Sequence, residues 1–461
     1  MPQNFIRGDV DQGFLLPPDV RDWLPDEHLA WTVRDVVESL DLAVFYRAYR
    51  ANGQGAAAFD PALMIAVLVY AHAVGVRSSR AIERHCAHDV AFRVLAGNQL
   101  PDHATIARFF RRHRKPLTGL FAQVLRLCHE AGMVRLGVIA VDGSKIAANA
   151  SWSANSTSAA LAHQVREERA RFRRLAAELL DEQAAIDAAE DAEHGPDRGD
   201  ELPPGLRRRG ERLARLAEAK KRLEDEDAAR VADQEAKKAE WQRRKAAGTR
   251  RGAQPGEKPP PTKSGKPPRA NTTDPDSRAM RGGRGLVQGY NAQAAVTADQ
   301  IIVGELLTQQ PVDAGLVFDV VDVVVEQLTA AGIGQAGDTV VADAGYANET
   351  AFAEAEARDM HLLAPLISDE RRAAGDDPAG PKPKIRRPAT LRAQAKLRTD
   401  QGKAEYALRG RTVEPVFGQI KDRQGLRQFL RRGLDNVTTE WSLACTVHNI
   451  RKLHAHRIAT A

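Results

Sequence analysis

Two short apolar stretches, VIAVDGSKIAA at residues 138–148 and TVVADAGY at residues 339–346, decide the fold class of this chain. Both consist largely of β-branched and small residues, a composition typical of buried strands. Each apolar run ends at an aspartate, Asp142 in the first and Asp343 in the second. We therefore predict two strands of an α/β fold that each deliver a carboxylate.

A third acid comes from the stretch RTVEPVFGQIKDRQG at residues 411–425, which places Glu414 at the start of a predicted helix. Carboxylate oxygens are the ligands that Mg²⁺ prefers. Two such cations can stabilise both the attacking and the leaving oxygen of an in-line displacement at a phosphodiester. Acids from two strands and a helix therefore predict a site for two Mg²⁺ (or Mn²⁺) ions.

Each acid also has a simpler explanation. Asp142 precedes Gly143, and Asp-Gly is a common pair in hairpin turns; Asp343 is followed by Ala-Gly. Glu414, in the first turn of a helix, gains from the helix dipole. Taken one at a time, these structural explanations are sufficient.

The first 135 residues are predicted to be helical. Asp60 and Pro61 form an N-cap followed by proline at the first helical position, and short helices follow around residues 79–86 and 102–115. The last of these is basic through Arg108, Arg111 and Arg112. This pattern predicts a helix-turn-helix that reaches DNA, but a helical bundle with a solvated charged face explains it equally well.

From residue 136 the pattern changes to strands and helices in alternation. After the first strand, we expect strands at residues 285–297, 300–310, 339–342 and 361–367, helices at 314–330 and 350–358, and the helix of Glu414. Residues 159–270 interrupt this order with a charged antiparallel helical hairpin and a Pro/Gly/Lys-rich tail. The predicted domains are therefore 1–135, 136–158 plus 271–461, and the insertion 159–270.

Composition adds weaker evidence. The formal net charge is +6 and 43% of the residues are hydrophobic, which favours an acidic partner such as nucleic acid and allows a sizeable core. The three cysteines are far apart and match no metal-ligand spacing, so we expect reduced thiols. The chain shows no signal peptide and no membrane-spanning run. We expect a cytoplasmic protein without a membrane partner.

Several phrases resemble the DDE transposases of bacterial insertion sequences. They are NTTDPDSRAMRGGRGLVQGYNAQAAV (271–296), ADAGYAN (342–348), VEPVFGQIK (413–421), and the stretch from GFLLPPDV to RRHR (13–114). The chain is most similar to the branch with a Tyr…Arg…Glu…Lys signature, in the group numbered eleven-eighty-two. The resemblance implies a ribonuclease-H-like catalytic domain. It also explains why all three acids fall at the elements that this fold requires, which the separate structural explanations do not.

The resemblance also implies roles for individual residues. Asp142, Asp343 and Glu414 would be the catalytic metal ligands, and Tyr406, Arg409 and Lys421 would contact DNA. One departure matters: four residues rather than three separate Arg409 from Glu414. Arg411 is therefore an alternative to Arg409.

The expected activity is that of a transposase, which acts on double-stranded DNA. It would bind terminal inverted repeats, hydrolyse phosphodiester bonds at the element ends and transfer the 3′-OH ends to target DNA, working as a homodimer on DNA. Two alternatives stay open at this point. One is a stand-alone metal-dependent nuclease, and the other is a DNA-binding protein that has kept the fold and lost catalysis.

Overall fold

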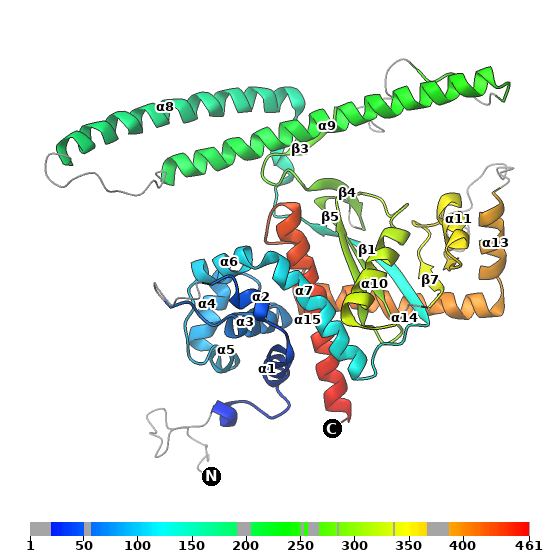
Figure 1. Ribbon diagram of the computed structural model, residues 1–461, viewed down its shortest axis with the longest axis horizontal. Coiled ribbons are helices and arrows are strands. Elements are labelled where there is room, and N and C mark those ends of the chain that lie inside the picture. Colours follow the sequence, from blue (N-terminus) through cyan, green and yellow to red (C-terminus); the bar gives the residue numbers. More distant parts are fainter. Residues whose placement is uncertain are drawn as a thin grey trace, which may run out of the picture.

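The computed structural model describes residues 20–49, 57–190, 204–249, 253–256, 267–283, 285–334, 337–366 and 387–460, with side chains of the insertion described over 158–178 and 207–249. The fold is mixed α/β. In Figure 1 the N-terminal helices lie to one side of the sheet, and two long helices extend across the top of the molecule.

The central sheet mixes antiparallel and parallel pairs. Its strands run in the order β4-β5-β1-β7-β8, with β6 also paired to β5. Strand β1 is antiparallel to β5 and parallel to β7. The bounds are Val138–Ala147 (β1), Arg278–Gly282 (β4), Gly285–Val296 (β5), Ile302–Thr308 (β6), Thr339–Ala342 (β7) and His361–Leu363 (β8). The five predicted strands are confirmed, although β8 ends earlier than expected, while β4 was not predicted.

The turn explanation for Asp142 and Gly143 is wrong. Strand β1 continues through Asp142 to Ala147, and Gly143 lies opposite Gln293 of β5 in the antiparallel ladder. A Cβ atom at position 143 would lie 2.1 Å from Gln293 Nε2. A larger residue at this position would therefore force the buried Gln293 side chain to move.

Helices cover both faces of the sheet. Helix α10 (Val317–Ala331) packs on β6 so closely that a Cβ at Gly304 would lie 2.5 Å from Val324 Cγ2. Side chains alternate along a strand, so the neighbouring Glu305 faces the other way, toward α15 (Leu434–Thr460). Helix α14 (Asp400–Arg423) packs on β1, β5 and β7. Helices α11 (Glu349–Ala357) and α13 (Pro388–Leu397) pack together beside β8.

Helix α14 corrects a prediction, because it begins at Asp400 and not near Glu414. Thr399 caps it by accepting the Gly402 N–H at 3.0 Å. Pro415 therefore lies inside the helix, where it removes the N–H that would bond to the Arg411 carbonyl. Gln300, in the turn between β5 and β6, donates Nε2 to that carbonyl at 2.9 Å. The turn thus satisfies the acceptor that the proline leaves unpaired, and Glu414 is held in mid-helix.

The N-terminal part is helical, as predicted. Its helices are α1 (Leu29–Ser39), α2 (Ala43–Tyr46), α3 (Pro61–Ala73), α4 (Ser79–His88), α5 (Val90–Leu95), α6 (His103–Arg112) and α7 (Arg114–Glu130). Asp60 caps α3 by accepting the Ala62 N–H at 2.7 Å. The basic helix predicted over residues 102–115 is instead two helices, because the backbone leaves helical geometry at His113.

One hydrophobic core joins the N-terminal helices to the sheet. Helix α15 lies between them, in contact with α1, α3 and α7 and, through other residues, with β6. Trp441 and His448 of this helix are buried, at 0% and 2% exposure, so both belong to the core. The three cysteines are free and buried. The search of the described residues found no helix long and apolar enough to cross a membrane.

The insertion forms two long antiparallel helices, α8 (Ser158–Glu190) and α9 (Pro204–Ala246), which extend away from the sheet (Figure 1). Strands β2 (Asn155–Thr157) and β3 (Arg269–Asn271) pair at its base. Its core is a separate small cluster that includes Leu161, Leu216 and Leu223. Most of the predicted Pro/Gly/Lys-rich tail lies outside the described residues.

Glu305 makes stability depend on pH. Burial raises its pKa from the ordinary 4.5 to about 8, although the nearby Ser442 opposes this shift. The folded chain thus keeps a proton that the unfolded chain releases, so the free energy of unfolding should fall as pH rises from about 4.5 to about 8. Glu305→Gln removes this loss and should be more stable than the unaltered chain at pH 8, by on the order of 4 kcal/mol.

Urea denaturation at pH 5, 6.5 and 8 measures this effect. The advantage of Glu305→Gln should grow with pH, whereas Glu326→Gln, at an exposed site on α10, should follow the unaltered chain. An advantage that is the same at all three pH values would contradict the assignment.

Candidate active site

The parallel register of β1 and β7 brings the first two acids together. Val141 of β1 is paired with Ala342 of β7. Asp142 and Asp343 each follow one residue later, so they leave neighbouring strands at the same level of the sheet. Adjacent strands are about 4.8 Å apart. The two carboxylates are close enough for the charge of Asp343 to raise the pKa of Asp142.

Helix α14 carries the third acid, Glu414, and an arginine of the same helix links this acid to Asp142. Arg409 donates to Asp142 Oδ2 at 3.0 Å and to Glu414 Oε1 at 3.0 Å. The side chains of Arg409 and Asp142 are mostly buried, at 17% and 16% exposure, while Glu414 is 54% exposed. The guanidinium therefore links the strand acid to the helix acid at the edge of the protein surface.

The electrostatics of the site are those of crowded carboxylates. Burial is the main cause that raises the pKa of Asp142 to about 6; Arg409 lowers it, and Asp343 raises it further. Burial lowers the pKa of Arg409, but Asp142 and its neighbouring acids raise it by more. The pKa of Arg409 therefore lies above its ordinary value. The acids therefore stabilise the positive charge of Arg409. Around Asp142 this single positive charge does not offset the effects of burial and of the neighbouring carboxylate on its pKa.

Sequence reasoning missed a fourth acid, Asp313, in the loop between β6 and α10. Lys145 Nζ donates to both of its oxygens, at 2.7 and 2.9 Å. The side-chain amides of Asn291 and Gln293 also donate to it, at 2.9 and 2.8 Å. Asp313 is thus already supplied with donors and braces β1 against β5. The only hint in the sequence was an acid placed soon after a strand.

Tyr346 connects this brace to the acids. It is fully buried, and its hydroxyl donates to Gln293 Oε1. Burial raises the pKa of Tyr346 well above its ordinary value, and Asp313, Asp142 and Asp343 raise it further. The ADAGY stretch therefore supplies both an acid and a neutral buried hydroxyl beside it.

Of the other predicted residues of α14, some lie close to the acids and one is exposed to solvent. Lys421 is half-buried and interacts with the charge of Asp142; burial is the main cause that lowers its pKa. Tyr406 is close enough to Arg409 to raise the pKa of that guanidinium. Arg411 is exposed and two residues from Arg409, a spacing that turns side chains to nearly opposite sides of a helix. The structure therefore brings Arg409, and not Arg411, to the acids.

The predicted basic residues of α6 lie on a different part of the molecule. Arg108, Arg111 and Arg112 are all exposed. Arg112 donates to the Ala48 carbonyl and stacks 4.6 Å from the Tyr49 ring centre. With Arg108 it lines a pocket of about 240 Å³. These side chains are available to solvent as a basic surface of the N-terminal helices.

Asp274 and Asp276, two acids of the loop before β4, serve the start of α15. Asp274 is buried and accepts the Tyr290 hydroxyl at 2.9 Å and the Gly433 N–H at 3.1 Å. Asp276 accepts the Leu434 N–H at 2.8 Å. Their oxygens therefore cap a helix and hold a turn.

The donor set around Asp142 suits a divalent cation. Asp142, Asp343 and Glu414 offer hard oxygen ligands, and burial together with a neighbouring carboxylate makes the charge of Asp142 unfavourable without a cation. Arg409 supplies positive charge to two of the acids as the side chains stand. In the part of the chain that the structure describes, no three such side chains converge in metal-binding geometry. Coordination by all three acids would require Arg409 to turn away.

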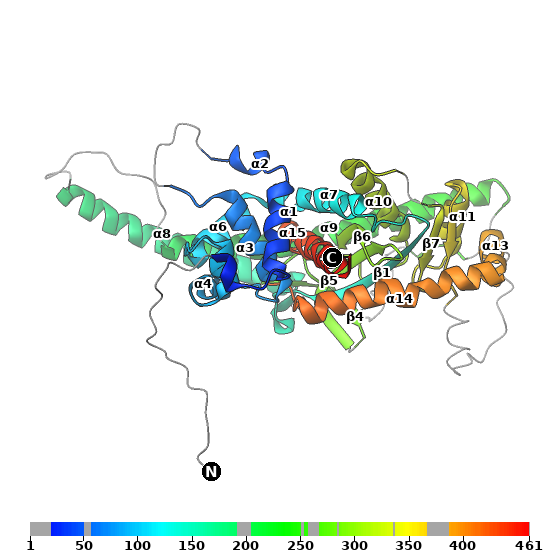
Figure 2. The same ribbon diagram turned by 90° about the horizontal axis from the view of Figure 1, so that it is seen from below.

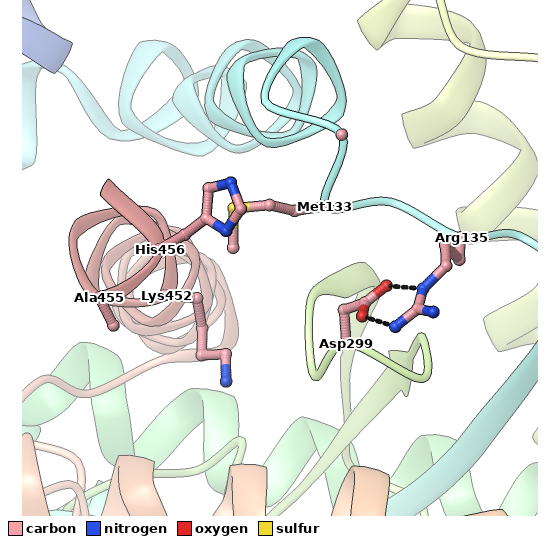
Figure 3. Close-up of a pocket in the computed structure, with 7 residues that line it drawn as sticks. Met133, Arg135, Asp299, Lys452, Ala455 and His456 are labelled. Carbon is pink, nitrogen blue, oxygen red and sulfur yellow. Dashed lines mark hydrogen bonds and ion pairs between the residues drawn. The ribbon is translucent and has the colours of Figure 1, made fainter. Parts of the chain in front are cut away.

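A separate hollow of about 460 Å³ lies between the end of α7, the β5–β6 turn and the end of α15. In Figure 3 the Arg135 guanidinium and the Asp299 carboxylate face one another across its rim, while Lys452 and His456 project from α15. None of the predicted acids lines it. It is therefore not part of the candidate active site.

Carboxylates from two parallel strands and a crossing helix are typical of enzymes that act on nucleic-acid phosphodiesters. Two family models match the chain: a transposase domain (DUF772) over residues 18–112, and a transposase DDE domain over residues 382–454. The two matches support an insertion-sequence DDE transposase, as the sequence predicted. Neither match assigns it to the group numbered eleven-eighty-two.

The matched segments cover the N-terminal helices and the region of α13 to α15. Glu414 lies inside the second segment, while Asp142 and Asp343 lie outside both. Their assignment to the site thus depends on the sheet register and on Arg409. No curated protein and no solved structure matches the chain.

Proposed function

We propose that this transposase binds the terminal inverted repeats of its own element, cleaves phosphodiester bonds at the element ends and joins the freed 3′-OH ends to target DNA. The observation that carries the proposal is that Arg409 donates to both Asp142 and Glu414, while the charge of Asp343 acts on the same guanidinium. The sheet supports a ribonuclease-H-like catalytic domain, because β6, β5 and β1 are antiparallel neighbours and β1, β7 and β8 follow in parallel.

In this proposal the three acids hold two divalent cations, Mg²⁺ or Mn²⁺. When bound, such a pair polarises a water or 3′-OH nucleophile and stabilises the departing oxygen. The chain's own residues do the positioning. Asp313 and Lys145 brace the strand that carries Asp142. Lys421 lies beside the acids, where its ammonium group suits a DNA phosphate.

Arg409 has two roles in the proposal. With DNA absent it neutralises Asp142 and Glu414, and with DNA present its guanidinium turns to a phosphate, for which its planar fork is well suited. Tyr406 lies beside it. Arg411, with Arg108, Arg111 and Arg112 of the N-terminal surface, belongs to the wider set of proposed DNA contacts.

A supercoiled plasmid that carries the DNA flanking the coding region tests the proposal against both alternatives. With Mg²⁺, a transposase should excise the segment between the ends and join it to a second plasmid. Nicking without joining would indicate a stand-alone nuclease. Binding without any strand break would indicate a catalytically silent DNA-binding protein.

Two element ends must be processed together, so the proposal implies a homodimer on DNA, and the α8–α9 hairpin is a candidate for that contact. Its core is separate from the main core, although Arg222 ties it to β3 by donating to the Arg269 carbonyl at 2.9 Å, and to the loop before β4 by donating to the Ser277 carbonyl at 3.3 Å. Strands β2 and β3 bring its two ends side by side. A short linker can therefore replace the hairpin.

Deleting residues 159–267 and inserting a four-residue Gly/Ser linker should leave a folded, soluble protein. Paired-end cleavage on the plasmid should fall by at least about tenfold, while binding of a single-end duplex should change less than about threefold, since the acids and N-terminal helices remain. The full-length variant Arg222→Ala serves as the control for the lost contact at the hairpin base. Unfolding of the deleted protein, seen by circular dichroism, would show that the hairpin belongs to the main core.

A further inference from the structure

A basic pocket lies at the junction of the N-terminal helices with the catalytic part of the chain. It has a volume of about 470 Å³, and its walls come from the first turn of α4, from α6 and from the loop after α14. Three arginines, Arg77, Arg80 and Arg431, line it together with Glu440. The pocket thus has more positive than negative charge.

Glu440 does not neutralise the pocket, because its oxygens are already engaged. It accepts the Arg77 guanidinium and the backbone N–H groups of Leu430 and Arg431, the latter two at 3.1 Å. It is 2% exposed, as expected for a structural carboxylate. Arg80 is exposed at the rim, and among the described residues no carboxylate forms an ion pair with Arg431, on which Glu440 acts only through its charge.

Arg431 is held in place by an aromatic ring. Its guanidinium lies 3.2 Å from the ring centre of Phe110, a fully buried residue of α6. Burial lowers its pKa to about 10; Glu440 opposes this shift, and Arg111 and Arg77 add to it. A fixed, partly desolvated cation among other cations is a favourable place for an anion.

The pocket also lies near the acids. The turn that carries Arg77 packs against the end of α14: a Cβ at Gly75 would lie 3.3 Å from the Arg423 carbonyl, and Arg77 donates to the Gly425 carbonyl at 2.9 Å. Figure 2 shows α14 running from the α11 and α13 side of the sheet toward the N-terminal helices. At 1.5 Å per residue, Glu414 and Arg423 are about 14 Å apart along the helix.

The loop that forms one wall is attached to the strand of Asp142. Phe429 donates its N–H to the Ala147 carbonyl at 2.8 Å, and Gln428 Nε2 donates to the Ala148 carbonyl at 2.9 Å. The pocket is therefore fixed relative to the active site. One DNA strand rises about 3.4 Å per nucleotide, so the length of α14 from Glu414 to Arg423 corresponds to about four nucleotides of one strand.

We propose that this junction pocket binds a backbone phosphate of the same DNA duplex that the active site cleaves, with Arg80 and Arg431 as its ligands and Arg77 as their support. The proposal rests on the proposed function. Phosphate contacts fix the register of a duplex on a protein without reading its sequence. The pocket would thus set the distance between the end recognised by the N-terminal helices and the bond that is cut.

Fluorescence anisotropy of the full-length protein with a labelled 30-bp mixed-sequence duplex tests the inference, in EDTA and over a range of NaCl concentrations. Arg80→Ala should weaken binding about fivefold and make the slope of log K against log salt shallower by about one. Arg431→Gln should have a similar effect, with melting temperature measured to show that it is folded. Arg84→Ala, an exposed arginine one turn along α4 that is not in the pocket, should keep the unaltered slope.

Unchanged slopes in folded Arg80→Ala and Arg431→Gln would overturn the inference. Melting with inorganic phosphate distinguishes the two possible sources of the bound anion, a free phosphate ion and a phosphate of the DNA backbone. If inorganic phosphate raises the melting temperature of the unaltered chain but not of the variants, while all of them bind DNA alike, the pocket takes only small anions and the inference is also wrong. Because binding is measured in EDTA, failure of the proposed catalysis appears separately, as absent cleavage with normal salt slopes.

Discussion

Replacing any one of Asp142, Asp343 and Glu414 by alanine is expected to reduce cleavage of the element ends by at least about 10³-fold, since in the proposed mechanism each change removes a ligand from cations that contribute several kcal/mol to the transition state. Binding of an end duplex should not weaken, because these carboxylates repel phosphate and do not contribute to affinity in EDTA. Single-turnover cleavage in Mg²⁺, with binding followed by anisotropy in EDTA, measures both effects.

Asp400→Ala is the matched control for these variants, because Asp400 is an exposed acid in the first turn of the same helix as Glu414. It should cleave at the unaltered rate. If Glu414→Ala retains near-normal cleavage, the third ligand has been misassigned, and Asp313 becomes the acid to test, since it lies among the same side chains. Glu354 is a weaker substitute, because it is paired with Arg358 on α11.

The second large effect is expected for Glu440→Ala, in the wall of the junction pocket. The change leaves Arg77, whose side chain is only 6% exposed, as a buried cation without its carboxylate, and it also removes the acceptor of two backbone N–H groups. Breaking one side of a buried ion pair typically costs 3–5 kcal/mol. We expect a loss of that order in the free energy of unfolding, measured by urea denaturation.

The double variant Arg77→Ala with Glu440→Ala provides the internal comparison. It removes both members of the buried Arg77–Glu440 pair, so it should be less destabilised than the sum of the two single changes. If the free energy of unfolding of Glu440→Ala lies within about 1 kcal/mol of that of the unaltered chain, solvent must reach Arg77, and the assignment of a buried ion pair is wrong.

Much of the architecture was predictable from local patterns. Asp60 and Pro61 start α3 as expected, and the strand TVVA has the bounds that its composition predicted. The hairpin was recognisable because its narrow apolar stripe needs only the other arm as a partner. Family phrases pointed to Asp142, Asp343 and Glu414, and the register of two parallel strands is consistent with a common position for the first two.

Other features depend on residues that are distant in sequence, and only the tertiary structure decided them. Asp142 and Gly143 look like a turn until Gln293 of another strand is placed across from them. Pro415 suggests a helix start until Gln300 supplies the missing donor. Asp313 resembles any loop acid until Lys145 reaches it. For Asp142 and Asp313 the local preference is worth about 1 kcal/mol or less, while the partner from elsewhere in the chain contributes as much or more.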